Sequence, residues 1–454
     1  MGEIDTKEMY SKFIKIAWPC ALEGLLLSLM SSLDTIMVSR ISDTAIASVS
    51  LCSMPRMLLL VIAQALCVGT TALVARRKGE ENREAAISVL KQSLVLIFIV
   101  GIIITLLGIY GAPFFVWLAG GNETTSYDAI IYFKIIAAAF IANCLSMCIC
   151  AAFRGVGQTK VTMVVQVSSN IINVILNYCL IYGKFGFPAL GIKGAAIATS
   201  IGTVVGFLIA LVFAMHHEEY LYLRAYKGLK FDSATLSGLL KVGSGSVAET
   251  AFLRLGLLLN GRLVAGVSND VYTTTQIVQQ ISSLSFTLGD GAGASATSLI
   301  GQSLGAKDYE RAKKYAKIGR NVALMMSAIL IIVVILGRRY FAYLFTSRET
   351  IIYASSLCFI VLAIGLVPQN LRVTSSGCLR GAGDVKFVAL ISLLSVTFIR
   401  PLCTYLICYH LDKMFPGYYL SYLGPWLAFD IDALIRSILL TKRINKGEWV
   451  KIKL

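Results

Sequence analysis

The sequence has little charge for its length, few histidines and no C-x-x-C pair of cysteines, and each shortage excludes a class of protein. Only 15% of the 454 residues are charged, whereas 57% are hydrophobic, and this balance excludes an ordinary soluble globular protein. The three histidines, His216, His217 and His410, form no H-E-x-x-H motif, so nothing supports a zinc centre. The eleven cysteines form no C-x-x-C pair and lie almost wholly in apolar stretches, which is typical of small apolar side chains rather than of a disulfide framework.

The long apolar runs that the sequence does contain predict an all-α integral membrane protein. They recur along the whole chain at about 20 residues each, the length that a helix needs to cross ~30 Å of hydrocarbon. Hydropathy predicts twelve transmembrane helices, at 13–38, 45–75, 88–112, 128–153, 161–183, 190–214, 237–264, 272–304, 317–345, 350–379, 384–409 and 419–441.

The positions of the Lys and Arg residues along the chain explain its excess of positive charge. The 41 basic residues exceed the 25 acidic ones and give a net charge of +16, which in a soluble protein would suggest nucleic-acid binding. Here most Lys and Arg residues outside the spans lie in the terminal segments and the even-numbered connections. By the positive-inside rule both termini are then cytoplasmic. The excess charge faces anionic lipid headgroups, and no nucleic-acid partner is expected.

An internal repeat divides the chain. Residues 153–160 read FRGVGQTK and residues 379–386 read LRGAGDVK, an offset of 226 positions that Glu23 and Glu249 share. Two six-helix lobes of the same orientation form a parallel repeat, whose symmetry axis lies along the membrane normal. We therefore expect an N-lobe at 1–215, a cytoplasmic linker at 216–236, a C-lobe at 237–441 and a basic cytoplasmic tail at 442–454.

Carboxylates inside the predicted spans mark candidate sites, because each costs roughly 2.5–3.5 kcal/mol at the centre of a membrane helix and must face protein or water. Asp432 has a structural explanation, since Arg436 lies one helical turn further on. The six carboxylates are Glu23, Asp34, Glu249, Asp290, Asp430 and Asp432.

Asp34 differs because no basic residue lies within a turn of it in the sequence. The fifth span carries Asn170, Asn173 and Asn177 on one face, and the sixth span offers Thr199. One carboxylate with amide and hydroxyl oxygens suits a monovalent cation such as Na⁺, and the same carboxylate can instead bind a proton. The other interpretation is hydrogen bonding that only holds the helices together. These residues alone leave both interpretations open.

The second half is richer in charge. Glu249 stands near Arg254 in the sequence, and Arg372 and Arg400 also lie within spans. Such residues predict either a hydrated functional network or a set of satisfied ion pairs. If the network is functional, its arginines would select a ligand with negative charge, because guanidinium groups match carboxylates and phosphates. Arg262, Asp290 and Asp430 complete the set.

Several short motifs follow one another along the chain. They are Leu-Asp-Thr-Ile-Met-Val at 33–38, the turns Arg154-Gly155 and Arg380-Gly381, Asn-Tyr at 177–178, Ile-Tyr-Gly-Lys-Phe-Gly at 181–186 and Gly-Gln-Ser-Leu-Gly at 301–305. In this order and spacing they resemble the motifs of the multidrug and toxic compound extrusion (MATE) transporters, over essentially the whole length of the chain. The resemblance implies an antiporter that exports drugs or organic metabolites and admits Na⁺ or H⁺ by alternating access of two lobes.

The resemblance also suggests roles for individual residues. Asp34 looks like the family's acidic residue of the first lobe. Asn173, Asn177 and Thr199 match the positions that complete its proposed cation site, so Na⁺ would lie at Asp34, Asn173 and Asn177. Glu249 looks like the second-lobe acid of the Na⁺-coupled branch.

Two departures from the family pattern favour the first lobe as the cation site. Gln369 stands where the Na⁺-coupled branch carries an aspartate, and Asn177 stands where some relatives carry one. The second-lobe candidates are therefore Glu249, Asp290, Gln369, Arg254, Arg372 and Arg400.

We expect a monomer in the plasma (inner) membrane, in contact with lipid, that takes a small organic substrate and needs no cofactor beyond the coupling ion. The alternative is a flippase of lipid-linked saccharides, or of another amphiphile, in the same superfamily, which the charged second lobe would suit. An enzyme is not expected, because the spans contain no histidine pair or Ser/His arrangement. A passive channel would give no reason for an isolated carboxylate beside an amide stripe.

Overall fold

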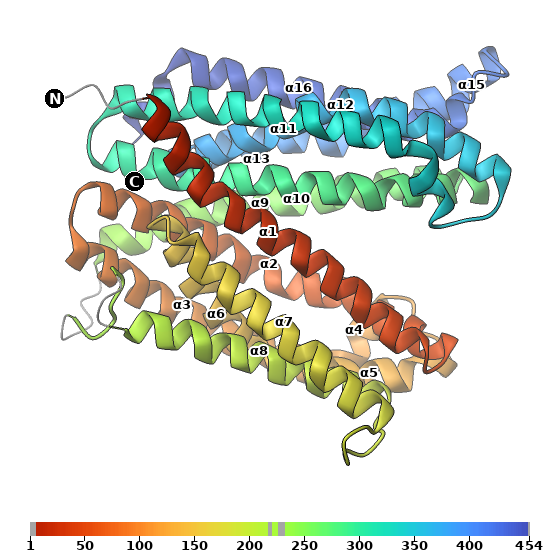
Figure 1. Cartoon of the computed structure of the whole chain (residues 1–454), viewed down its shortest axis with the longest axis horizontal. Coiled ribbons are helices and arrows are strands. Elements are labelled where there is room, and N and C mark those ends of the chain that lie inside the picture. The colour runs from red at the N-terminus through yellow and green to blue at the C-terminus, as the bar shows by residue number, and fades with distance from the viewer. Residues whose placement is uncertain (1–5, 217–219, 226–231, 453–454) are drawn as a thin grey trace. The chain divides into compact units, whose positions relative to one another are not determined.

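The structure of the chain is a computed structural model, and it describes residues 6–216, 220–225 and 232–452. The described residues form helices and no strand (Figure 1). The first half contains α1 (Thr6–Ser39), α2 (Asp43–Gly79), α3 (Arg83–Tyr110), α4 (Ala112–Leu118), α5 (Glu123–Ala138), α6 (Phe140–Gly155), α7 (Thr159–Tyr182) and α8 (Ile192–Met215). The second half contains α9 (Ser233–Ala265), α10 (Asn269–Gly305), α11 (Tyr309–Tyr343), α12 (Glu349–Ala382), α13 (Val385–Ser392), α14 (Arg400–Tyr405), α15 (Asp412–Met414) and α16 (Leu420–Lys446), with π-helices η1 (Leu393–Ile399) and η2 (Leu406–Leu411) and a 3₁₀-helix η3 (Glu448–Lys451).

The helices are long and apolar enough for a multi-pass membrane protein. Within the described ranges nine helical segments could cross a membrane, or ten if the pair Thr125–Ala138 and Phe140–Gly155, bent by 48°, counts as one span. α10 and α16 are of similar length but carry more polar residues. Each of the twelve predicted spans corresponds to one helix or to a bent chain of helices, so the predicted fold is confirmed.

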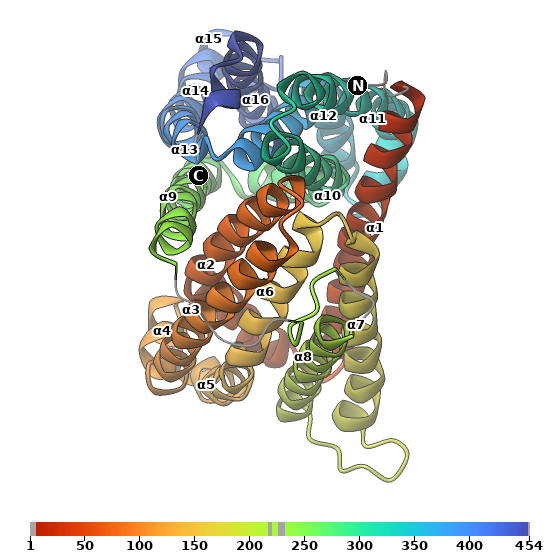
Figure 2. The same ribbon diagram turned by 90° about the vertical axis from the view of Figure 1, so that its left-hand side faces the viewer.

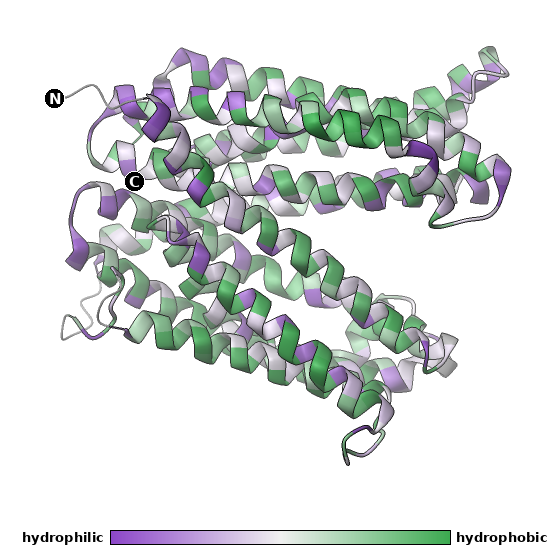
Figure 3. Cartoon of the chain, in the orientation of Figure 1, coloured by the Kyte–Doolittle hydropathy of each residue, from purple (hydrophilic) through white to green (hydrophobic). Residues whose placement is uncertain are grey.

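Hydrophobic residues predominate along most of the long helices, as Figure 3 shows. On α11 a stripe of exposed side chains recurs every three or four residues and would face lipid. Its members are Met325, Ile329, Ile332 and Leu336, which are 59–74% exposed.

By backbone contacts the chain forms two compact units. The N-unit is Leu22–Ser244, and the C-unit is Met1–Ala21 together with Gly245–Leu454. The start of α1 thus packs in the C-unit, where Phe13 is fully buried and its carbonyl accepts a hydrogen bond from Ser295 Oγ at 2.7 Å. Of the predicted linker at 216–236, residues 217–219 and 226–231 lie outside the described residues, as do 453–454 of the predicted tail.

Small residues let neighbouring helices approach closely within a unit. In the N-unit α7 and α8 lie side by side in Figures 1 and 2. A Cβ atom at Gly202 of α8 would lie 2.9 Å from the Ser169 carbonyl of α7. Glycine therefore sets the spacing of these two helices, as is common in membrane bundles.

The sequence repeat is reproduced as duplicated contacts within each unit. Each pair of equivalent residues is separated by 226 positions. Two of the duplicated contacts are helix caps, in which the Ala45 N–H donates to Ser42 Oγ and the Val271 N–H donates to Ser268 Oγ. The others are the ion pairs Glu23–Arg154 and Glu249–Arg380, and the hydrogen bonds that the Thr71 hydroxyl donates to the Ala151 carbonyl and the Thr297 hydroxyl donates to the Gly377 carbonyl.

The repeat gains one residue at η1. The Tyr182 hydroxyl donates to the Met37 carbonyl at 2.9 Å, and the Tyr409 hydroxyl donates to the Leu263 carbonyl at the same distance. Met37 and Leu263 differ by 226 positions, whereas Tyr182 and Tyr409 differ by 227. A π-helix accommodates the extra residue because its hydrogen bonds reach five residues along the chain instead of four. Beyond η1, equivalent residues are therefore 227 positions apart.

Candidate functional site

Three helices of the N-unit bring Asp34, Asn173, Asn177 and Thr199 together, as the sequence predicts. Asn177 Nδ2 of α7 donates to Asp34 Oδ1 of α1 at 2.7 Å. Asn173 lies one turn earlier on α7, and its side chain contacts both Asp34 and Thr199 of α8. The two asparagines are 6% and 1% exposed, so the amides are kept from bulk water.

The amide of Asn173 has two orientations with different consequences for Asp34. With its nitrogen toward Asp34, it donates to Oδ1 at 2.9 Å and Oδ2 at 3.1 Å, and its oxygen accepts from the Thr199 N–H and hydroxyl. With the amide reversed, its nitrogen donates to Thr199 Oγ1 at 3.1 Å, and its oxygen faces the carboxylate. The second orientation gathers oxygen atoms around one point, which a cation or a proton would stabilise.

The site opens into a cavity of about 770 Å³ formed by α1, α2, α6, α7 and α8. Asn170 lines this cavity but donates to the Gln166 carbonyl of its own helix at 2.7 Å. Only two members of the predicted amide stripe therefore contact Asp34. The volume lies within the range of small-molecule sites.

Arg56 of α2 also lines this cavity, and the sequence analysis missed it. Its signal in the sequence is a single basic residue within an apolar run, directly after Pro55. Among the described residues no Lys, Arg or His lies within 4.0 Å of the Asp34 carboxylate, so Arg56 shares the cavity without forming an ion pair with Asp34.

Glu23, the other acid of this region, is already satisfied. Thr162 Oγ1 donates to Glu23 Oε2 at 2.8 Å, and Arg154 Nη1 lies 3.5 Å from Oε1. In the described part of the chain no three His, Cys, Asp or Glu side chains gather as they would at a transition-metal site. The oxygen donors at Asp34 instead suit a monovalent cation.

All six second-lobe candidates line one cavity of about 280 Å³ in the C-unit. Glu249 pairs with Arg380 of α12 at 2.6 Å rather than with Arg254, its neighbour in the sequence. Five residues turn a helix by about 500°, which places Arg254 on another face of α9 than Glu249. Gln369 is 1% exposed there.

The remaining charged residues of this half differ in burial and in their contacts. The predicted pair of Asp432 and Arg436 is confirmed at 2.7 Å, and Ser395 Oγ donates to Asp432 at 2.5 Å. Arg262 is exposed, and Asp430 packs against Gly365. Neither lines the cavity. Asp430 nevertheless interacts electrostatically with Arg400, which lines the cavity.

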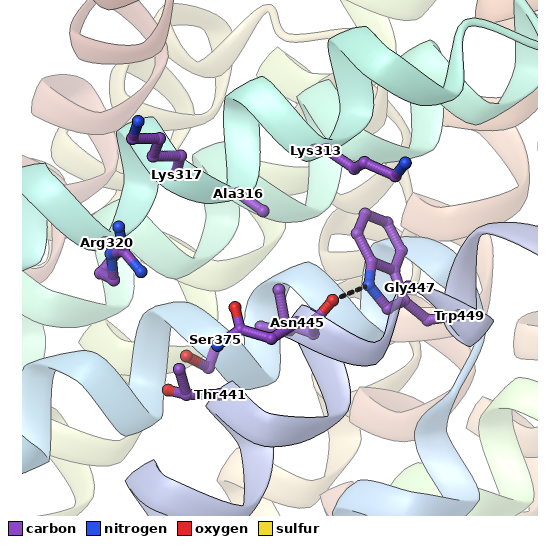
Figure 4. A pocket seen from close by; sticks show the side chains of 10 residues that line it. Lys313, Ala316, Lys317, Arg320, Ser375, Thr441, Asn445, Gly447 and Trp449 are labelled. Carbon is purple, nitrogen blue, oxygen red and sulfur yellow. Dashed lines mark hydrogen bonds between the residues drawn. The ribbon is translucent and has the colours of Figure 1, made fainter.

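A further pocket of the C-unit, of about 230 Å³, lies between α11 and the end of α16 with the residues that follow it (Figure 4). Lys313, Lys317 and Arg320 of α11 line one side, and the buried Trp449 lies opposite (Figure 4). Trp449 Nε1 donates to the Ile444 carbonyl at 2.8 Å. The bond helps to hold η3 against the end of α16.

Comparisons with known proteins agree with this architecture. The MatE family model matches residues 19–179 and 247–406, more than half of the chain. The chain is 28% identical over 437 residues to the transporter YisQ of Bacillus subtilis, covering 96% of this chain and 94% of that protein. It is 27% identical over 453 residues to the probable multidrug resistance protein NorM of Thermotoga maritima, covering 98% and 94%. Its fold matches an outward-facing MATE family transporter of the MOP superfamily with a TM-score of 0.87 and 20% identity over 97% of each chain.

Proposed function

This chain belongs to the MatE family of multidrug efflux transporters and not to a class of enzymes, and we propose that it exchanges an organic substrate for Na⁺ or H⁺ bound at Asp34. The observation that carries the proposal is the contact of Asp34 with Asn173 and Asn177. Reversing the Asn173 amide adds its oxygen to those of the carboxylate. Asn177 Oδ1 is buried without a hydrogen-bond partner in the described structure and supplies another oxygen.

The amide reversal couples ion binding to the packing of three helices. With the site empty, Asn173 Nδ2 holds the carboxylate, and Thr199 bonds to the amide oxygen. A bound cation or proton turns the amide and changes the hydrogen bonds that join α1, α7 and α8. Ion and substrate that favour different conformations then exchange rather than leak. A membrane potential of 100 mV supplies ~2.3 kcal/mol per imported charge for this exchange.

The location and assembly proposed from the sequence fit the same function. We place the protein in the plasma (inner) membrane as a monomer. Both of its termini lie in the cytoplasm in this proposal, because most Lys and Arg residues outside the spans lie in the terminal segments and the even-numbered connections. The organic substrate and the surrounding lipid are its partners, and the coupling ion takes the place of a cofactor.

The second candidate function is a flippase for a lipid-linked saccharide or another amphiphile. The arginine-rich cavity of the C-unit favours it, because a phosphate-bearing headgroup would match guanidinium groups. Export of a water-soluble compound by proteoliposomes that contain no lipid-linked saccharide would contradict the flippase.

The test is transport in proteoliposomes with a Na⁺ gradient and a pH gradient imposed separately. We expect one gradient to drive export of an organic compound, and Asp34→Asn to abolish the driven flux while the protein still inserts and folds. The matched control is Glu310→Gln on the exposed face of α11, which should transport normally. Full driven activity of Asp34→Asn would overturn the coupling role of Asp34.

A further inference from the structure

The C-unit contains a copy of the Asp34 site in which the charge is inverted. Asp34 corresponds to Asn260 at the offset of 226, and beyond η1 Asn173 corresponds to Arg400 at the offset of 227. The contact is retained: Thr404, the equivalent of Asn177, donates to Asn260 Oδ1 at 2.6 Å. An acid has thus become a neutral amide, and an amide has become a guanidinium group. The same local geometry that suits a cation in the N-unit suits an anion here.

Two arginines of this region are buried without an ion-pair partner among the described residues. Arg372 and Arg400 are 8% and 7% exposed. Among the described residues no carboxylate lies within 4.0 Å of either group, and the Nε atom of each has no hydrogen-bond partner. Each guanidinium instead faces a ring, Phe286 at 5.9 Å and Phe429 at 4.8 Å. An unpaired charge at this depth is costly unless a ligand compensates it.

The neighbouring acids supply only part of that compensation. Asp430 and Asp432 interact electrostatically with Arg400 but form no ion pair with it. Five arginines but only two carboxylates, Glu249 and Asp290, line the cavity. Glu249 is paired with Arg380. Asp432, just outside the lining, is paired with Arg436 and also accepts a bond from Ser395. The cavity therefore retains an excess of positive charge.

The cavity also has room and surface for an organic ligand. Leu253, Leu257 and the two phenylalanine rings line it beside the arginines. A second cavity of about 290 Å³ shares Leu257, Gln279 and Arg400 with it. Arg400 thus stands where two polar cavities of the C-unit meet.

We propose that the substrate of this transporter is an amphipathic organic anion, whose carboxylate or phosphate group binds between Arg372 and Arg400 and whose apolar part lies against Phe286 and Phe429. The inference rests on the proposed transport function and names its substrate class. It distinguishes this chain from an exporter of lipophilic cations, because Arg372 and Arg400, which form no ion pair within the described part of the chain, would repel such cations.

The test uses the purified full-length protein in detergent and three probes with one ring system. By calorimetry we expect 1-naphthyl phosphate and 1-naphthoate to bind more tightly than trimethyl(1-naphthylmethyl)ammonium. Arg400→Asn, which restores the residue of the other repeat, and Arg372→Gln should each weaken binding of the anions about 10- to 100-fold, the range for a lost charged hydrogen bond. Arg400→Lys should retain part of the affinity. Arg348→Gln, which breaks an exposed ion pair with Asp270, is the control and should bind normally.

Two results would overturn the inference: cation binding as tight as anion binding, or anion affinity unchanged in Arg400→Asn and Arg372→Gln. To test whether the natural anion is a lipid headgroup, the titration is repeated in nanodiscs of phosphatidylglycerol and in nanodiscs of phosphatidylcholine. Competition by phosphatidylglycerol that Arg400→Asn abolishes would show that the anion is a lipid headgroup and would overturn the assignment to a small substrate. Equal binding in both lipids supports it.

Flux measurements separate this inference from the coupling proposal. If Asp34→Asn transports 1-naphthyl phosphate normally under a gradient while Arg400→Asn binds it weakly, the coupling role fails and the substrate class stands. If Asp34→Asn loses driven flux while the arginine variants export the anion normally, the coupling role stands and the substrate class fails.

Discussion

The buried arginines of the C-unit are of two kinds, and the distinction is made at the scale of single residues. Arg436 and Arg380 each neutralise a buried acid. Arg372 and Arg400 form no ion pair with an acid among the described residues. Removing a member of the first kind leaves a carboxylate buried and unpaired, whereas removing a member of the second kind breaks no ion pair.

Stability should therefore respond in opposite ways to two similar substitutions. We expect Arg436→Gln to lower the free energy of unfolding by about 3–5 kcal/mol, because Asp432 is fully buried and would lose its ion pair. Arg400→Asn should leave the unfolding temperature unchanged or raise it. Thermal unfolding in detergent without ligand checks both. A strong destabilisation by Arg400→Asn would mean that Arg400 serves structure rather than binding.

The residues of both candidate sites could be found largely from the sequence, because a charge inside an apolar run has few explanations. Asp34 and its amides meet as expected, and so do the six second-lobe candidates. What the sequence did not reveal was pairing between distant helices. Glu249 contacts Arg380, which lies 131 positions away, rather than its neighbour Arg254.

At the scale of helices, η1 determines which side chains of the following helix face the cavities of the C-unit. Its extra residue shifts the register of everything that follows by one position, so Arg400 rather than Ile399 takes the place of Asn173. Hydropathy could not predict this, since it reports the length and polarity of a segment and not whether hydrogen bonds reach four or five residues. The break after Ala138 and the short helix α4 were missed for the same reason.

Deleting Leu394 should therefore preserve anion binding. This side chain of η1 is 51% exposed, so its loss removes little packing. Without the extra residue, η1 can return to the α-helical hydrogen bonding of α7, and Arg400 keeps the place that Asn173 has in the other repeat. We expect calorimetry to give the same affinity for 1-naphthyl phosphate in the deletion variant, in Leu394→Ala and in the unaltered protein. Loss of binding in the deletion variant alone would show that η1 does not simply accommodate one inserted residue.

At the scale of the whole molecule, the duplicated half has diverged in charge while its contacts were kept. Glu23–Arg154 and Glu249–Arg380 are equivalent, and the contact that Asn177 makes with Asp34 has its equivalent in Thr404 and Asn260. The repeat in the sequence was sufficient to predict two similar halves. Their functional difference depends on register and burial, which only the structure supplies. The candidate site of one half then suits a cation and that of the other half an anion, which is consistent with the exchange that we propose.

Linkage between the two sites gives the last prediction. If cation and anionic substrate favour different conformations, each must weaken the other's binding by the same factor. We expect saturating Na⁺, or low pH if the protein is H⁺-coupled, to weaken binding of 1-naphthyl phosphate about 5- to 150-fold, the usual range of such coupling. Calorimetric titrations at two Na⁺ concentrations, with choline chloride holding the ionic strength, measure the factor, and the reverse titration must return the same value. Asp34→Asn should abolish it without changing the affinity for the anion in the absence of Na⁺. An anion affinity that depends on neither Na⁺ nor pH would show that the two sites are not linked, and exchange through Asp34 would then lack its thermodynamic basis.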